Sequence, residues 1–282
     1  MSDTNTHENE NELIAAEAVK RLSRDLRNAA KLMGVREARF YVDCYYSIQQ
    51  FRISNANQHR KMMEGAEPNE LMVWFSANLV TLEKQLQGAL DKWSNEQPMG
   101  RYARSICGIG PVIAAGLVAH IDIEKAPTPG HIWSFAGLNP TVKWNKGQKR
   151  PWNASLKRLT WICSESFVKV SGNPKDIYGK LYLQRKEYEA ARNEAGGNAE
   201  AAKERLAQPG AKKLDPGLIE ILKSGKLPQI ALHERAKRWS IKVFLSHYWE
   251  RAYELRYGTV PPAPFPIAHL GHVHKIQAPP MV

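Results

Sequence analysis

Two short stretches of the chain contain residue types that suit phosphate binding. The first covers residues 105–120, with the sequence SICGIGPVIAAGLVAH. Gly108 and Gly110 allow a tight turn and a close approach of the backbone to a partner, because glycine has no Cβ. Pro111 suits the first turn of the next helix, whose N-terminal N–H groups favour an anion. We therefore predict a helix-hairpin-helix that holds a nucleic-acid phosphate; the alternative is a glycine turn that only packs two helices. The predicted contact residues are Gly108, Ile109, Gly110 and Val112.

The second stretch, residues 143–158, combines six basic residues with two tryptophans. Basic side chains neutralise phosphates, and a tryptophan ring can stack on an exposed base. We therefore predict nucleic-acid binding here; the alternative is a solvated basic loop whose tryptophans anchor the core. The predicted contact residues are Lys143, Trp144, Lys146, Lys149, Arg150, Lys157 and Arg158.

A third group of candidate side chains is the histidine cluster near the C-terminal end of the sequence. His269, His272 and His274 could share a metal ion with His247, although no cysteine or carboxylate lies near them in sequence. Docking of the proline-rich tail on the body of the protein explains the cluster more simply. We therefore predict neither a metal nor a cofactor, with a divalent metal needed only if the protein is catalytic. The sequence contains no Walker loop, HExxH, GxSxG or Rossmann fingerprint, which excludes several enzyme classes.

The overall composition agrees with a nucleic-acid partner. The 282 residues give a formal net charge of +12 and a pI near 9.6, which is the electrostatic property expected of a protein that binds a phosphate polymer. The three cysteines are widely spaced, so a disulfide framework is not expected and a reducing compartment is favoured. The acidic N-terminal residues are not typical of a secretory signal, and no apolar run is long enough to span a membrane. We expect a cytoplasmic protein with no membrane partner.

Most of the chain shows the helical spacing of apolar residues, so the predicted fold is mainly α. We expect a multi-helix protein with a central helix-hairpin-helix domain and an extended C-terminal tail. A helix is expected over residues 37–51, followed by a polar interval around 55–69. Residues 70–93 form a long amphipathic helix that could pack in a bundle or mediate homo-oligomerisation as a coiled coil. The predicted domain organisation is a disordered acidic tail (1–11), an N-terminal helical region (12–98), the central domain (99–172), a charged, solvated helical insertion with loops (173–230), and a C-terminal helix with a proline-rich tail (231–282).

The order of two motifs resembles a known family. Residues 108–115, GIGPVIAA, are followed by residues 135–140, FAGLNP, and then by Lys149-Arg150 and a helix that begins near Asn153. This order resembles the C-terminal transposase domain of the DEDD insertion-sequence transposases, the Piv/MooV-type recombinases. The resemblance covers residues 99–170 and implies DNA transposition or recombination, with double-stranded or branched DNA as the partner and a mobile element or phage as the setting.

The chain also departs from that family pattern. The resemblance implies a RuvC-like domain with four metal-binding acidic residues on strands, but residues 1–100 are predicted to be helical, which gives Asp25, Asp43 and Asp91 no strand context. The family serine is absent from residues 143–147, and Ser155 is predicted to be a surface or packing residue. We therefore predict a DNA-binding protein whose catalytic residues are unknown. The alternatives are an active transposase with an unrecognised catalytic site, and a non-enzymatic scaffold or RNA-binding protein.

Overall fold

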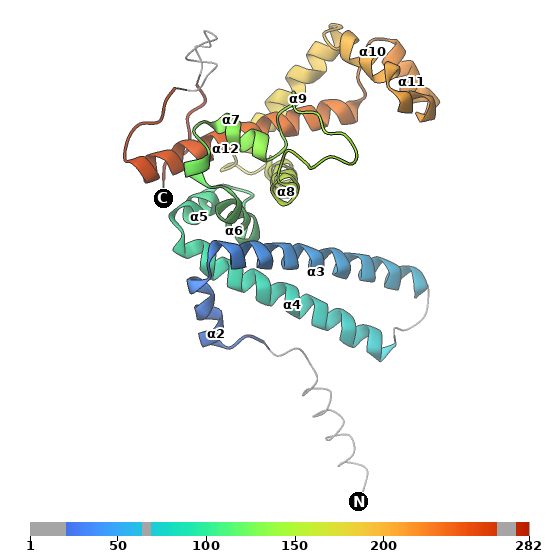
Figure 1. Ribbon diagram of the computed structural model, residues 1–282. Helices are drawn as coiled ribbons and strands as arrows, with labels where there is room; N and C mark the ends of the chain where they lie inside the picture. Colours follow the sequence, from blue (N-terminus) through green and yellow to red (C-terminus); the bar gives the residue numbers. More distant parts are fainter. Residues whose placement is uncertain (1–20, 64–68, 264–274, 282) are drawn as a thin grey trace, which may run out of the picture. The chain divides into compact units, whose positions relative to one another are not determined.

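The computed structural model describes residues 21–63, 69–263 and 275–281 (Figure 1). Throughout these residues the regular elements are α-helices and short 3-10 helices, and none is a strand. The predicted mainly α fold is therefore confirmed. None of the described helices is both long and apolar enough to cross a membrane. The predicted acidic tail (1–11) and His269, His272 and His274 lie outside the described residues.

The chain divides into two compact units. Unit 1 comprises residues 1–101 and 114–120, and unit 2 comprises residues 102–113 and 121–282. Two short helices, α5 (Pro98–Ser105) and α6 (Pro111–His120), therefore each contribute residues to both units. The domain limits expected from the sequence remain predictions.

Unit 1 is built on two long helices that lie side by side, α3 (Val35–Met62) and α4 (Glu70–Glu96) (Figure 1). They follow a short helix α2 (Arg24–Ala29) and the 3-10 turn η1 (Ala30–Leu32). The helix predicted over residues 37–51 corresponds to α3, and its predicted end near residue 51 is wrong, because α3 continues through the polar residues to Met62. No glycine or proline interrupts that stretch, and polar contacts with α4 hold it. Arg52 pairs with the mostly buried Glu83, and the Asn55 amide donates to Ser76 Oγ at 3.0 Å.

Unit 2 is organised around the C-terminal helix α12 (Gln229–Tyr257). It contacts α7 (Pro129–Phe135), α8 (Ala154–Val170) and α9 (Tyr178–Glu194), as well as the 3-10 turn η2 (Ile123–Lys125). Aromatic rings fill the space between α8, α9 and α12. The Phe167 ring stacks on Tyr178 with centroids 5.0 Å apart, and Phe244 meets both rings edge-on.

Helix α9 corrects one expectation about residues 173–230. It was expected to belong to a solvated insertion, but Tyr178 and Tyr182 on α9 are buried and the helix packs along α12. The sequence pattern does not indicate this packing, because nearly half of the other positions of α9 are charged and its buried positions are few. The remaining elements of this region are α10 (Ala199–Ala207), η3 (Pro209–Lys213) and α11 (Pro216–Lys223). Helices α10 and α11 share a small core around Ala202 and Leu222.

The described part of the tail docks on α12. The guanidinium of Arg251 donates to the carbonyl oxygens of Ala278 and Pro279, both at 2.7 Å, and Lys275 pairs with Glu250. His247 also contacts this segment through the carbonyl of Ile276. These contacts agree with the simpler explanation of the C-terminal region, in which the tail packs on the body of the protein.

Candidate nucleic-acid interface

The two glycines of the GIG motif have different structural roles. Gly108 has φ = +90°, a conformation that side-chain-bearing residues rarely adopt. A Cβ at this position would lie 3.1 Å from Val170 Cγ2 and 3.3 Å from Ser166 Oγ, both on α8. The Ser166 hydroxyl also donates a hydrogen bond to the Gly108 carbonyl. Gly108 therefore shapes the turn and holds it against α8.

Gly110, in contrast, faces open space. A Cβ at this position would find no atom within 4 Å, and its φ lies outside the left-handed region. The fold therefore does not require glycine here, which leaves close approach of an external partner as a reason for it. Ile109 and Val112 are buried, so only their backbone groups could contact a ligand. The helix-hairpin-helix assignment and the contact role of the four residues remain predictions.

The turn after α7 brings the second motif together with the basic segment. Gly137, with φ = +66°, ends α7: its N–H donates to the Ser134 carbonyl at 3.0 Å, and the Leu138 N–H donates to the Trp133 carbonyl at 2.8 Å. This is the Schellman pattern of a helix C-terminus. A Cβ on Gly137 would lie only 2.9 Å from Lys157 Cδ and 3.0 Å from Trp152 Cγ. Glycine thus lets the basic segment pack directly on the end of α7.

The start of α8 is fixed at the same place. Asn153 precedes the helix as its N-cap, and its Oδ1 accepts a hydrogen bond from the Leu156 N–H at 2.8 Å. The Asn153 N–H in turn donates to the Phe135 carbonyl at 2.9 Å. The position of the first turn of α8 is therefore determined by the end of α7.

A groove opens along this first part of α8, with a volume of ≈ 640 Å³. Its lining residues are Trp144, Arg150, Trp152, Ala154, Lys157, Arg158 and Trp161. We call this set the tryptophan groove. It combines three indole rings with three cations, and none of its lining residues is acidic. The spacing of Ala154, Lys157, Arg158 and Trp161 places them on one face of α8.

Contacts among the side chains hold the tryptophan groove in shape. The Trp144 and Trp152 rings meet edge to face with centroids 6.4 Å apart, and the Trp144 Nε1–H donates to the Gln148 carbonyl at 2.8 Å. Arg150 lies over the Trp144 ring, and the Lys157 ammonium lies 4.2 Å from the centroid of the Trp152 ring. The tryptophan rings and the cations therefore lie next to one another. A ring could stack on a base while a neighbouring cation contacts the phosphate beside it.

The structure brings together four of the seven basic-segment residues predicted as contacts, with Trp144, Arg150, Lys157 and Arg158 all lining the tryptophan groove. Lys143, Lys146 and Lys149 are exposed on the preceding loop and do not line it. Trp161, which also lines the tryptophan groove, is not among the contact residues predicted from the sequence. Trp161 is 54% exposed, and its position three and four residues after Arg158 and Lys157 is the signal in the sequence that indicates it.

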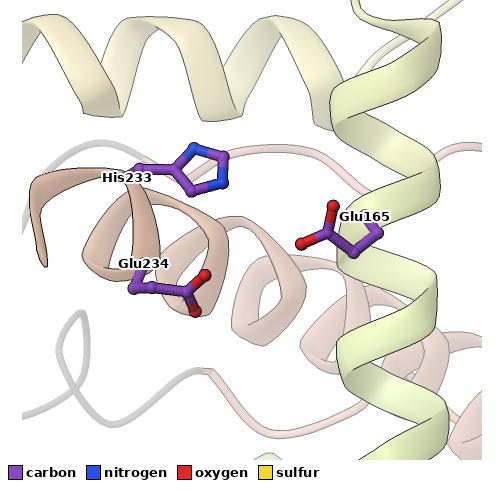
Figure 2. Close-up of side chains that lie close together, drawn as sticks. All are labelled: Glu165, His233 and Glu234. Atoms are coloured by element: carbon purple, nitrogen blue, oxygen red, sulfur yellow. The ribbon is translucent and has the colours of Figure 1, made fainter. Parts of the chain in front are cut away.

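A second cluster, of acidic residues and a histidine, has the composition of a metal site. Glu165 of α8 lies close to His233 and Glu234 of α12, as Figure 2 shows. The ammonium of the buried Lys237, however, donates to Glu165 Oε1 and to Glu234 Oε1. His233 Nδ1 is within 2.8 Å of the Tyr182 hydroxyl. A divalent ion would therefore have to displace a buried ammonium, which favours an ion-pair cluster that joins α8 to α12.

His247, the proposed fourth member of the histidine cluster, already uses both ring nitrogens. Its Nε2 is 2.9 Å from the Ile276 carbonyl, which can only accept, so Nε2 is protonated. Nδ1 then accepts from the Tyr178 hydroxyl, also at 2.9 Å. Burial lowers the pKa of this imidazole. The ring is therefore a neutral structural group between α9, α12 and the tail, and it has no free nitrogen for a metal.

The acidic candidates for cleavage chemistry lie on helices. Asp25 is on α2, Asp43 on α3 and Asp91 on α4, consistent with the expected lack of a strand context. Ser155 lies in the first turn of α8 and is partly exposed.

Comparison with known proteins adds one finding. Residues 100–159 match the model of the IS116/IS110/IS902 transposase family, about a fifth of the chain. The matched segment includes the GIG turn, α7, the basic loop and the first part of α8. No curated protein and no solved structure matches the chain. The match supports a transposase domain in this segment, a role in insertion-sequence transposition and an interaction with DNA.

Proposed function

We propose that this protein acts in insertion-sequence transposition as a DNA-binding protein and that the tryptophan groove is its main contact with DNA. The observation that supports the proposal most directly is the lining of the groove, which holds three tryptophans and three cations without a carboxylate. The family match spans most of the same residues, from the GIG turn to Leu159.

Each part of the site has a defined task in this proposal. Arg150, Lys157 and Arg158 neutralise phosphates, and binding of this kind depends little on sequence. The exposed ring of Trp161 offers a stacking surface for a base that is unpaired at a junction or a strand end. Gly110 lets the DNA backbone approach the start of α6. The preferred DNA is therefore branched or locally unpaired rather than a plain duplex.

The test is an equilibrium binding panel with fluorescently labelled linear duplex, four-way branched DNA and structured RNA of equal length. Trp161→Ala removes the stacking ring, and a loss of about 1–3 kcal/mol of binding free energy to branched DNA is expected from stacking energies. Trp74→Ala, which removes a partly exposed tryptophan of α4, is the matched control and should leave the affinity unchanged.

The same binding panel tests the predicted contacts between basic side chains and phosphates. Lys157→Gln should reduce the steepness of the dependence of log K on log salt by about 0.9 for duplex DNA, the value for one phosphate contact. Lys169→Gln, which removes an exposed lysine of the same helix outside the groove, should not change it. Equal affinities of wild type and both groove variants, or tighter binding to RNA than to any DNA, would contradict the proposal.

A further inference from the structure

Unit 2 contains a second, separate cleft on α12, with a volume of ≈ 780 Å³. Its walls are the turn after α7 (residues 137–142), one face of α9, the start of α10 and one face of α12. Helices α9 and α12, which form two of these walls, lie side by side (Figure 1). The basic lining residues are Arg185, Arg192, Arg235, Arg238 and Lys242. The acidic lining residues are Glu189, Glu200 and Glu204. We call this site the arginine cleft.

The floor of the arginine cleft is held by a network of polar side chains. Glu189 is buried and pairs with Arg185 at 2.5 Å and with Arg235 at 3.6 Å. Arg235 also donates to Asn198 Oδ1 at 2.6 Å, and the Asn198 amide donates to Asn193 Oδ1 at 3.0 Å. The charge of Glu189 is therefore already neutralised by two of the five cations. This network fixes the positions of α9, α10 and α12 around the cleft.

The other three cations are not paired with Glu189, and the Lys242 ammonium lies 5.2 Å from the centroid of the Trp133 ring. Within the described part of the chain, no carboxylate lies within 4.0 Å of the charged groups of Arg192, Arg238 or Lys242. Arg238 uses its Nε–H on the Glu234 carbonyl, which leaves its remaining N–H groups for another acceptor. Burial, and after it the charge of Arg238, lower the pKa of Lys242. Two neighbouring cations without a counter-charge are stabilised when an anion binds.

The α12 wall of the cleft also carries one aromatic side chain. Trp239 lines the cleft between Arg235 and Lys242, and Arg185 lies 5.6 Å from the centroid of its ring. The exposed Glu200 and Glu204 line the cleft from α10, whereas Arg238 and Lys242 line it from α12. An anionic group is thus attracted to α12, and a flat ring beside it can lie along Trp239. These are the two chemical features of a nucleotide unit.

We propose that the arginine cleft binds the phosphate of a nucleotide unit through Arg238 and Lys242, with Arg192 completing the site and Trp239 contacting the base. The unit is either part of a nucleic-acid strand or a free nucleotide, which share this chemistry. The site is distinct from the tryptophan groove, with which it has no lining residue in common.

The experiment uses the full chain with the tryptophan groove disabled by Trp161→Ala and Lys157→Gln, so that it does not depend on the function proposed above. Calorimetric titration compares deoxyadenosine 5′-monophosphate, deoxyadenosine and the single-stranded oligonucleotide dT8. Arg238→Gln with Lys242→Gln should weaken binding of a phosphate-containing probe about tenfold or more, since two charge-assisted hydrogen bonds are lost. Deoxyadenosine has no phosphate. Its affinity for the protein with an intact arginine cleft should therefore be no higher than the affinity of the Arg238→Gln, Lys242→Gln variant for the monophosphate.

Two further variants make the result decisive. Lys186→Gln with Lys203→Gln removes two exposed lysines of α9 and α10 outside the cleft and should not change the affinity. Arg192→Gln changes an exposed residue on α9 and leaves α12 unaltered. It should also lower the affinity for the phosphate-containing probe. If the cleft variants lose affinity for the monophosphate, a free nucleotide is a ligand. If they lose affinity only for dT8, the ligand is a nucleic-acid strand. If neither probe distinguishes the cleft variants from the lysine control, the proposal is wrong.

Discussion

The backbone N–H of Asn153 donates a hydrogen bond to the carbonyl oxygen of Phe135, with the two atoms 2.9 Å apart. Phe135 is the last residue of α7, and Asn153 is the N-cap of α8. The contact closes the loop that contains Trp144 and Arg150 and brings both ends of it together.

Replacing Gly137 by alanine should open the junction between α7 and the tryptophan groove. At φ = +66° an alanine costs about 1–2 kcal/mol, and its Cβ would press on Trp152 Cγ at 3.0 Å in addition. Urea unfolding should therefore show a larger loss of stability than for Gly147→Ala. Gly147 also has positive φ, at +90°, but a Cβ there meets nothing within 4 Å. Equal losses for the two variants would show that the contact with Trp152 is unimportant.

Asn153→Ala should affect both stability and DNA binding. Loss of an N-cap side chain costs about 1 kcal/mol, and here it also loosens the helix end that presents Lys157 and Arg158 to the groove. Asn69 caps α4 in the same way, with its Oδ1 accepting from the Leu71 N–H at 2.9 Å. Asn69→Ala should therefore show a similar loss in urea unfolding and no change in DNA affinity. A change in DNA affinity for both variants would attribute the effect to general destabilisation.

Gly110→Val should weaken DNA binding and leave the helical circular dichroism signal and the unfolding temperature nearly unchanged. The substitution introduces a branched side chain at a position where a Cβ has no protein atom within 4 Å. The side chain should therefore clash with bound DNA and not with the protein. Gly210→Val is the control, because Gly210 lies on η3 and is equally open. Unchanged DNA affinity in Gly110→Val would show that the GIG turn has only a structural role.

The stability of unit 2 should fall as the pH is lowered through the range in which His247 titrates. Burial lowers its pKa in the folded protein below the value of about 6.5 that it has when unfolded. Between these two values the unfolded chain binds a proton that the folded chain does not, so the free energy of unfolding decreases with falling pH. Below the folded-state pKa the contribution becomes constant.

The measurement is urea unfolding between pH 5 and pH 7.5. His247→Gln should lose less stability over this range than the wild type, because the side chain no longer titrates. The buried His120 of unit 1 has its pKa lowered in the same direction by burial, so the difference between variant and wild type is the quantity to compare. His131→Gln, a change at an exposed histidine of α7, should behave like the wild type. An identical pH dependence in His247→Gln would contradict the assignment of a neutral imidazole.

The sequence alone determined the helical character of the chain, the positive charge and the two motifs that the family match also covers. Helical periodicity, capping residues and positive-φ glycines are local properties, so they can be recognised without knowing the packing. The predicted end of α3 is wrong because residues 52–62 are mostly polar but contain no glycine or proline; the first such residue is Gly65. The packing of α9 on α12 is not evident from the sequence, because two buried tyrosines among many charged residues give a weak periodic pattern.

Only the tertiary structure decided which residues act together. The path of the loop between α7 and α8 brings Trp144 and Trp152 beside Trp161, and no spacing in the sequence encodes that path. The arginine cleft combines residues from 137–142, α9, α10 and α12, which lie up to 105 positions apart in the chain, from Gly137 to Lys242. They meet because α7 and α9 pack on α12. The same packing gives Gly108 its contact with α8 and leaves Gly110 open. Binding sites depend on such long-range packing, whereas helices depend on short-range hydrogen bonds.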